Sequence, residues 1–142
     1  RDGCRTPMTW EKDAPNAGFS TGTPWLPVKP EQAAHAVDQQ GDDSILAFYK
    51  DVIARRKASP AMSRGVTTFL DLPEPLLAFT RVAVGETLTF VFNLSKDSHK
   101  ITLTGNAELA FSGQAALSGK TLTLDGNGYA YLAHDAKITL KT

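Results

Sequence analysis

The chain has 142 residues, of which 42% are hydrophobic and 21% are charged, and its fifteen basic and fifteen acidic residues cancel. This balance gives no electrostatic case for binding nucleic acid or an anionic membrane, and no apolar run approaches the ~18 residues that a membrane helix needs. Cys4 is the single cysteine, so a disulfide within the chain is excluded. The composition is that of ordinary soluble globular material.

Residues 1–27 are predicted to form an ordered surface loop. Three Gly and three Pro precede Pro27, and the apolar residues show neither the strand period nor the helix period. Two Trp, a Phe and a Met argue against disorder, because such side chains gain free energy by leaving water. The loop carries two guanidinium groups, Arg1 and Arg5, and loops of this kind often line a pocket.

The next segment, from Pro30 to Gly41, is polar and alanine-rich and is predicted to be a connector or a short helical turn. A helix follows, because apolar side chains recur there at helical spacing: Ile45, Phe48, Tyr49, Val52 and Ile53. Asp42, Asp43 or Ser44 can cap its start. Arg55, Arg56 and Lys57 suit the C-terminal end of the helix dipole, and Pro60 ends the helix.

After Met62 the pattern changes to the period of strands. Strands are predicted at residues 66–70, 76–84 and 87–94, and the alternation of Leu88, Phe90, Phe92 and Leu94 predicts one buried face. Shorter alternating stretches follow at Ile101 with Leu103, Leu122 with Leu124, Tyr129 to Leu132, and Ile138 with Leu140. Turn residues separate them, including Asp125-Gly126-Asn127-Gly128. Short strands at such spacing indicate an antiparallel sandwich.

The N-terminal loop also carries a resemblance. Arg1-Asp2-Gly3-Cys4-Arg5-Thr6-Pro7-Met8-x-Trp10, followed by Ala17-Gly18-Phe19 and Gly22-x-Pro24-Trp25, resembles the signature of α-glucosidases in glycoside hydrolase family 13. That family includes oligo-1,6-glucosidases, sucrose hydrolases and sucrose isomerases. The resemblance continues through Ile53-x-x-Arg56 and Phe92-Asn93-Leu94-Ser95 and covers essentially the whole chain. Thr9 departs from the Gln or Pro usual at its position, which bears on the subfamily and not on the class.

The resemblance implies a fold class. Members have an N-terminal (β/α)8 TIM barrel and a C-terminal antiparallel β-sandwich. Residues 1–63 would then be the last loop and helix of the barrel, and residues 64–142 the all-β sandwich of the α-amylase type. Because the chain begins inside the motif, we expect it to be the C-terminal portion of a larger enzyme.

Arg1 is the residue to which the resemblance assigns a function. The Arg that opens this motif in the family contacts the non-reducing-end glucose in the subsite beside the scissile bond. A guanidinium suits that task, because its rigid fork of donors can hold two neighbouring sugar hydroxyls. The structural alternative for such an Arg is an ion pair with a carboxylate such as Asp2. Arg5 is predicted to brace the loop through an ion pair.

No catalytic residue is predicted in this segment. Retaining glycosidases need two carboxyl groups about 5–5.5 Å apart, and the resemblance places the nucleophile, the acid/base and a third carboxylate upstream. No metal site or cofactor is predicted either: His35, His99 and His134 are read as surface residues. A structural Ca²⁺ or Mg²⁺ is an expectation only for the missing barrel portion. The expected partners are glucosides and that barrel portion, and the expected location is cytoplasmic, with periplasmic as the alternative.

Three functional alternatives stay open. The intact protein is expected to hydrolyse α-glucosidic bonds exo-fashion, or to act as a transglucosidase or sucrose isomerase. A rival is a non-catalytic carbohydrate-binding sandwich, which needs an exposed row of aromatic residues. The strand-region aromatics mostly alternate as core residues do, leaving Tyr129 and Tyr131 as the platform candidates. Trp10, Phe19 and Trp25 are interpreted as anchors of the loop, with stacking on a sugar as the alternative.

Overall fold

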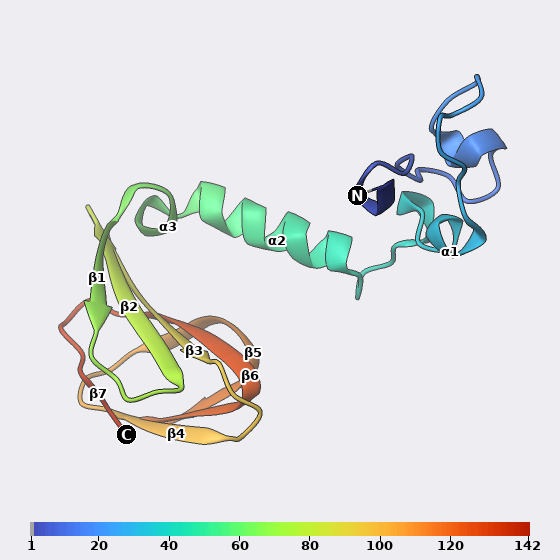
Figure 1. Cartoon of the computed structure of the whole chain (residues 1–142). Coiled ribbons are helices and arrows are strands. Elements are labelled where there is room, and N and C mark those ends of the chain that lie inside the picture. Colours follow the sequence, from blue (N-terminus) through green and yellow to red (C-terminus); the bar gives the residue numbers. More distant parts are fainter. Residues whose placement is uncertain (1) are drawn as a thin grey trace. The chain divides into compact units, whose positions relative to one another are not determined.

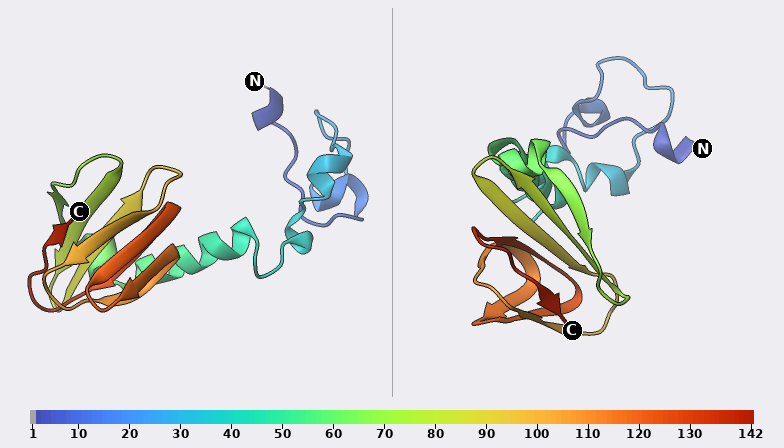
Figure 2. Two further views of the ribbon diagram at one scale, coloured as in Figure 1. Left: turned by 90° about the horizontal axis from the view of Figure 1, so that it is seen from below. Right: turned by 90° about the vertical axis from the view of Figure 1, so that its left-hand side faces the viewer.

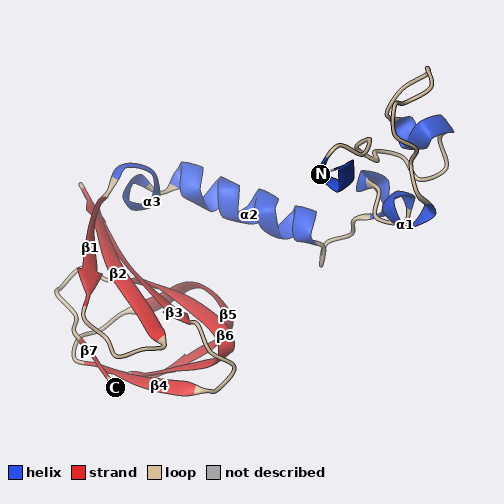
Figure 3. Cartoon of the chain, in the orientation of Figure 1, coloured by secondary structure: helices blue, strands red, loops and turns tan. Residues whose placement is uncertain are grey.

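The computed structural model describes residues 2–142, and the chain divides into two compact units, residues 1–54 and 55–142. The first unit consists of short helices and loops, whereas the described strands belong to the second (Figure 1, Figure 3). The helices are η1 (Asp2–Cys4), η2 (Pro15–Gly18), α1 (Pro30–Ala33), η3 (Val37–Gln39), α2 (Ile45–Ala58) and α3 (Pro60–Arg64). The strands are β1 (Val66–Leu70), β2 (Leu76–Ala83), β3 (Glu86–Asn93), β4 (His99–Leu103), β5 (Glu108–Ser118), β6 (Thr121–Ala133) and β7 (Leu140–Lys141).

Helix α2 confirms the predicted helix, and Ser44 is the residue that caps it. The Ser44 hydroxyl accepts a hydrogen bond from the backbone N–H of Ala47 at 3.1 Å, which satisfies one of the free amides of the first turn. The predicted apolar face is present but stays uncovered: Ile45 is 76% exposed and Tyr49 is 61% exposed. No helix within residues 2–142 is long and apolar enough to cross a membrane.

The strands form one antiparallel sheet in the order β1-β2-β3-β6-β4-β7, with β5 also paired to β6. Strand β6 connects two parts of this sheet. Its C-terminal half pairs with β3, with Tyr131 opposite Phe90, and its N-terminal half pairs with β4, with Leu122 opposite Ile101. Between the two halves the strand bends, so the sheet folds over on itself into two layers (Figure 2). The predicted antiparallel sandwich is confirmed.

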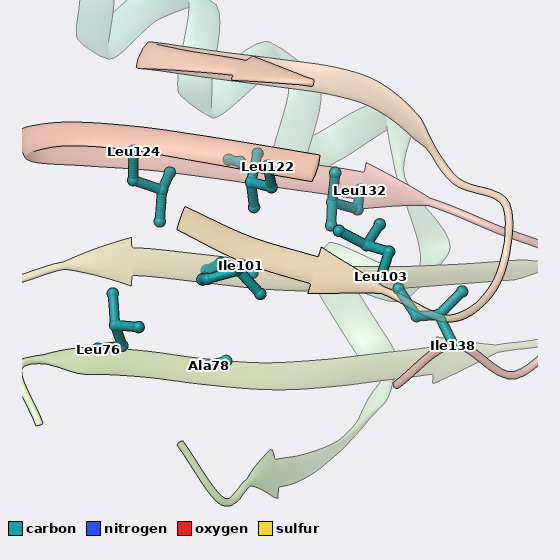
Figure 4. Close-up of a cluster of buried hydrophobic side chains, with 10 residues drawn as sticks. Leu76, Ala78, Ile101, Leu103, Leu122, Leu124, Leu132 and Ile138 are labelled. Atoms are coloured by element: carbon teal, nitrogen blue, oxygen red, sulfur yellow. The ribbon is translucent and has the colours of Figure 1, made fainter. Parts of the chain in front are cut away.

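The core lies between these two layers (Figure 4). Its buried residues come from β2, β3, β4, both halves of β6 and the segment before β7: Leu76, Ala78, Val91, Ile101, Leu103, Leu122, Leu124, Ala130, Leu132 and Ile138. Burying such aliphatic side chains contributes ~1.5–3 kcal/mol for each fully buried one. Ile138 contributes to the core from outside a strand, because β7 begins only at Leu140.

Strand β3 is buried on both faces, which corrects the prediction of one buried face. Thr89, Val91 and Asn93 point into the sandwich, whereas Leu88 and Phe90 lie on the outer face. Helix α3, which the strand-period reading missed, covers this outer face with Ala61 and Met62. The predicted face is therefore buried at Leu88 and Phe90, and the opposite face is buried as well, which the alternation alone did not indicate.

Two charged side chains of the sheet hold α3 in place. The Glu86 carboxylate accepts hydrogen bonds from the Ser59 hydroxyl at 2.8 Å and from the Ala61 N–H at 2.7 Å, at the start of the helix. Arg81 donates to the carbonyl oxygens of Ala61 at 2.8 Å and Gly65 at 2.9 Å, at its end. A negative group at the N-terminus and a positive group at the C-terminus both complement the helix dipole.

We expect Glu86→Ala to lower the free energy of unfolding by about 2 kcal/mol, because it leaves a helix amide and a hydroxyl without their acceptor. Glu108→Ala is the matched control, since that side chain is exposed at the start of β5, and a change within about 0.5 kcal/mol is expected for it. Chemical denaturation followed by circular dichroism measures both values. Equal effects of the two substitutions would show that Glu86 does not hold α3.

Two further elements differ from the predictions. Strand β5 was missed, because its second half is built from small residues such as Gly113 and Ala115 and its pairing with β6 is interrupted by irregularities. The predicted turn at residues 125–128 is part of β6, which runs on through it. The predicted boundary between domains, at residues 63/64, stays a prediction. The two compact units of the structure meet within α2, at residues 54/55.

Candidate functional site

Arg1, the predicted substrate-binding residue, lies outside the described residues. The motif that it opens is described from Asp2 onward, where η1 leads into an extended segment through Trp10. Asp2 is exposed, and its backbone carbonyl accepts from the Arg5 N–H at 3.0 Å. The predicted role of Asp2 as a partner for an arginine side chain stays a prediction.

Backbone hydrogen bonds fix the motif to the rest of its unit. The carbonyl oxygen of Ala17 accepts from the N–H groups of Trp10 at 2.8 Å and Glu11 at 3.2 Å. Ala17 is buried, and it lies in a run of three residues, Asn16, Ala17 and Gly18, with φ of 51°, 52° and 72°. Such a left-handed run is costly for the two residues that are not glycine. The hydrogen bonds from Trp10 and Glu11 therefore tie this turn to the motif.

Thr9, the position at which the motif departs from the family pattern, has a structural role. It is 8% exposed, and its hydroxyl donates to the carbonyl oxygen of Gln32 at 3.1 Å. Its own carbonyl accepts from the Val37 N–H at 3.1 Å. Thr9 therefore fastens the motif to the segment that follows it, a role that no local sequence signal could have revealed because the partners lie more than twenty residues away.

The Arg5 side chain contacts an aromatic ring, and its predicted ion pair stays a prediction. Its guanidinium carbon lies 5.9 Å from the centre of the Trp25 ring, which is within the range of a cation–π contact. Trp25 is 77% exposed and borders an open hollow of ≈ 450 Å³ together with Lys12, Asn16 and Pro24. Trp10 and Phe19 are each about half exposed. The interpretation that these aromatics anchor the loop to a barrel stays a prediction.

The three histidines differ in their surroundings. His35 is exposed, as predicted. His134 and His99 are half-buried, which corrects the reading of both as surface residues. A ring nitrogen of His134 lies 2.8 Å from the hydroxyl of the buried Thr89, and the other lies 2.9 Å from the carbonyl oxygen of Ala136. Among residues 2–142, no group of three His, Cys, Asp or Glu side chains is arranged to hold a metal ion.

The strand-region aromatics form one continuous row on the outer face of the sheet. We call this row the aromatic ladder; it consists of Phe69, Phe79, Phe90, Phe92, Phe111, Tyr129 and Tyr131. Successive ring centres lie 4.6–5.8 Å apart from Phe69 through Phe79, Phe90, Tyr131 and Phe111 to Tyr129. The prediction that these residues mostly alternate as core residues do is confirmed for Phe90, which is buried in a second core cluster on this face with Phe79, Phe92 and Tyr131 packed against it. Phe69 is 70% exposed.

The ladder is packed closely where it crosses β5 and β6. A Cβ atom on Gly113 would lie 2.6 Å from the ring of Tyr129, so the ring lies directly against the backbone of β5 in its present position. The Arg55 guanidinium carbon lies 4.3 Å from the centre of the Phe111 ring. Burial, and to a lesser extent the neighbouring Tyr129, raises the pKa of Tyr131 above its ordinary value of 10.0, so this phenol stays neutral at physiological pH.

Comparison with known sequences agrees with the motif. Residues 1–65 match the family described as alpha amylase, catalytic domain. A probable alpha-glucosidase of Rhizobium meliloti is 43% identical over 100 residues, which are 69% of this chain and 18% of that protein. A probable oligo-1,6-glucosidase of Bacillus subtilis is 41% identical over 68% of this chain and 18% of its own length. The chain thus spans about a fifth of the curated relatives that it matches.

Solved structures extend the similarity over nearly the whole chain. The alpha-glucosyl transfer enzyme XgtA is 38% identical, with a TM-score of 0.79 over 95% of this chain and 26% of that one. The trehalulose synthase MutB of Pseudomonas mesoacidophila is 29% identical, with a TM-score of 0.72 over 99% of this chain and 26% of that one. Motif, fold and sequence identity agree: the chain belongs to the α-amylase family, glycoside hydrolase family 13.

Proposed function

We propose that this chain is the C-terminal part of a retaining, exo-acting α-glucosidase that hydrolyses α-glucosidic bonds of short oligosaccharides or sucrose. The observation that carries the proposal is the N-terminal motif, which lies within the segment matched by the catalytic-domain family and is held rigid by its own hydrogen bonds. The curated relatives named above are glucosidases, which supports hydrolysis. The catalytic carboxylates, and any structural Ca²⁺ or Mg²⁺, belong to the barrel portion outside this chain. The proposed location is cytoplasmic, with periplasmic as the alternative.

In this proposal Arg1 holds the terminal glucose so that the anomeric carbon faces the nucleophile. The rest of the segment supports that clamp. Thr9 and Ala17 fix the path of the motif through backbone partners, and the contact between Arg5 and Trp25 joins its two ends. Support of this kind matters because a misplacement of ~1 Å at a positioning group can cost ~100-fold in rate.

Arg1→Ala in the full-length enzyme is expected to lower kcat/KM by about 100-fold on maltose, isomaltose or sucrose, because the terminal sugar loses its clamp. Arg1→Lys keeps the charge but loses the planar fork, so it is expected to restore only part of the rate. Arg64→Ala, on an exposed side chain at the end of α3, serves as the control. A kcat/KM for Arg1→Ala within a factor of about two of wild type would refute the role of Arg1.

A second candidate function belongs to the same family but transfers the glucosyl group to a different acceptor. The solved structures that resemble this chain include a glucosyl transfer enzyme and a trehalulose synthase, and one MutB structure is a complex with the substrate sucrose. In hydrolysis water takes the glucosyl group, whereas in transfer or isomerisation a sugar hydroxyl takes it. Chromatography of the products from sucrose separates the two: free glucose with fructose indicates hydrolysis, and a new disaccharide indicates isomerisation or transfer.

A further inference from the structure

The bend of β6 lies outside the ladders that hold the rest of this strand. The pairing of β6 with β4 ends at Leu124, and its pairing with β3 begins at Tyr129. The pairing with β5 is interrupted over the same stretch, since Ala115 lies opposite Leu124 and Gly113 lies opposite Tyr129. Residues 125–128 therefore have no partner in the registers of the described strands.

The bend carries an asparagine followed by a glycine, Asn127 and Gly128. The Asn127 side chain is exposed, and it makes no hydrogen bond within residues 2–142. The backbone of Asn127 has a φ of 58°, and its N–H donates to the carbonyl oxygen of Ser95 at 2.8 Å. Gly128 has no Cβ atom that could shield its backbone nitrogen from the amide of the preceding side chain. An unrestrained asparagine before glycine is chemically labile, because that nitrogen can react with the amide carbon.

The three other asparagines lack one or another of these features. The Asn16 side-chain nitrogen donates to two backbone carbonyl oxygens, each at 2.9 Å. Asn93 is 2% exposed, and hydrogen bonds hold both ends of its amide. Asn106 is exposed like Asn127, but the residue after it is Ala107, whose Cβ atom hinders an approach of the backbone nitrogen. Asn106 is therefore a matched control for the effect of the following glycine.

We propose that Asn127 is a site of spontaneous deamidation in the folded protein. The backbone nitrogen of Gly128 attacks the Cγ atom of Asn127, and the new C–N bond closes a succinimide ring. The side-chain nitrogen leaves as ammonia, with the proton that the Gly128 nitrogen loses. Water then opens the ring: attack at Cγ gives aspartate, and attack at the backbone carbonyl carbon gives isoaspartate. This inference goes beyond the proposed function and does not depend on the role of Arg1.

The isoaspartate product changes the strand itself. Its main chain runs through the Cβ and Cγ atoms, so β6 becomes one methylene longer between Leu124 and Tyr129, which the ladders hold on either side. Gly126 and Gly128 lie against backbone carbonyl oxygens, with no room for a Cβ atom. The bend therefore cannot take up the extra methylene without moving, and we expect this product to be less stable than the original chain. The aspartate product only adds a charge at an exposed position.

Incubation of the 142-residue chain at mildly alkaline pH, folded and in urea, tests the proposal. Peptide mapping by mass spectrometry measures the deamidation rate at each asparagine, and electron-transfer fragmentation separates isoaspartate from aspartate. In the folded chain Asn127 is expected to react at least about tenfold faster than Asn106. Folding is expected to slow Asn93 by about tenfold or more and Asn127 by less than about threefold, because only the Asn93 side chain is held.

The effect on stability is measured on the aged chain. Material rich in isoaspartate is expected to melt about 5 °C lower, whereas Asn127→Asp, which brings the charge without the methylene, should stay within about 2 °C of the unaged chain. Asn127→Gly suits the positive φ and removes the reacting amide, so it should keep its Tm on ageing. An Asn127 rate no higher than that of Asn106, or one that folding slows about tenfold, would overturn the proposal. An equal fall in Tm for aged Asn127→Gly would overturn the assignment of the instability to this site.

Discussion

Asn93→Ala is expected to lower the free energy of unfolding by about 3–5 kcal/mol, because one buried side chain satisfies several backbone groups at once. Asn93 is 2% exposed at the end of β3. Its amide nitrogen donates to the carbonyl oxygens of Asp97 at 2.7 Å and Asp125 at 2.9 Å. Its oxygen accepts from the N–H of Ser95 at 3.0 Å and from the hydroxyl of the same residue at 2.9 Å.

These hydrogen bonds join three parts of the chain: the end of β3, the turn at residues 95–98, and β6 where it bends. Alanine at this position would leave two carbonyl oxygens and an N–H without their partner around a side chain that is 2% exposed, and each such group costs about 1–3 kcal/mol where water does not reach it.

Thermal and urea unfolding measure the effect, and a fall in Tm of more than about 10 °C is expected for a unit of this size. Asn93→Asp tests the donor side separately, because a carboxylate keeps the acceptor but presents negative charge to the carbonyl oxygens. Ser98→Ala is the matched control: its hydroxyl donates to Asp125 at 3.1 Å from an exposed position. A loss for Asn93→Ala no larger than that for Ser98→Ala would show that the junction is not held by Asn93.

The sequence predicted most accurately the helices and strands whose ends are set by a local pattern of residues. The bounds of α2 and of the first two strands follow from periodicity and from Pro60, and they agree with the structure within a few residues. Motif residues such as Asn93 carried a family resemblance, but their spacing did not reveal what they bind. Asn93 acts on Asp125, thirty-two positions away, and no property of the residues around it encodes that separation.

The outer face shows why burial was harder to predict than strands. Alternation says that two sets of side chains point to opposite sides of a strand, and it does not say which side faces the core. The aromatic residues were predicted to be core residues because they alternate along the strands, and they gather in a cluster of their own on the outer face. The cluster between the two layers is filled by leucine, isoleucine, valine and alanine. Helix α3 buries part of the outer face by packing on it. The sequence pattern did not reveal this helix, because its five residues are too few to show a helical period.

The bend of β6 is a second feature that the local sequence pattern did not predict. A glycine at this bend is also the site of the second substitution with a large expected effect on stability. Asp125-Gly126-Asn127-Gly128 has the composition of a turn, yet the strand continues through it. The two glycines are needed because other backbone segments come close, the turn at residues 95–98 to Gly126 and strand β5 to Gly128. A Cβ atom on Gly126 would collide with the carbonyl oxygen of Lys96, and one on Gly128 with the carbonyl oxygen of Gln114. Both carbonyls are backbone groups, which cannot move aside as a flexible side chain can.

Gly126→Ala is therefore expected to cost about 3–5 kcal/mol, because either β6 or the turn at residues 95–98 must shift, and that shift breaks the hydrogen bonds of Asn93. Gly85→Ala is the matched control in the same sheet. Gly85 has a φ of 77° but open space around it, so its substitution should cost only about 1 kcal/mol through the backbone conformation. Urea denaturation compares the two variants.

A double-mutant cycle between Gly126→Ala and Asn93→Ala then tests the physical link between the two sites. Both substitutions act on the same junction, so the second should cost clearly less once the first has opened it, with a coupling energy within the 0.5–3 kcal/mol range found for residues that share contacts. Additive losses would mean that the bend of β6 and the Asn93 hydrogen bonds are independent. In that case the two layers of the sandwich would be held together by the aliphatic core alone, and the bend would follow from the pairing of β6 with β3 and β4.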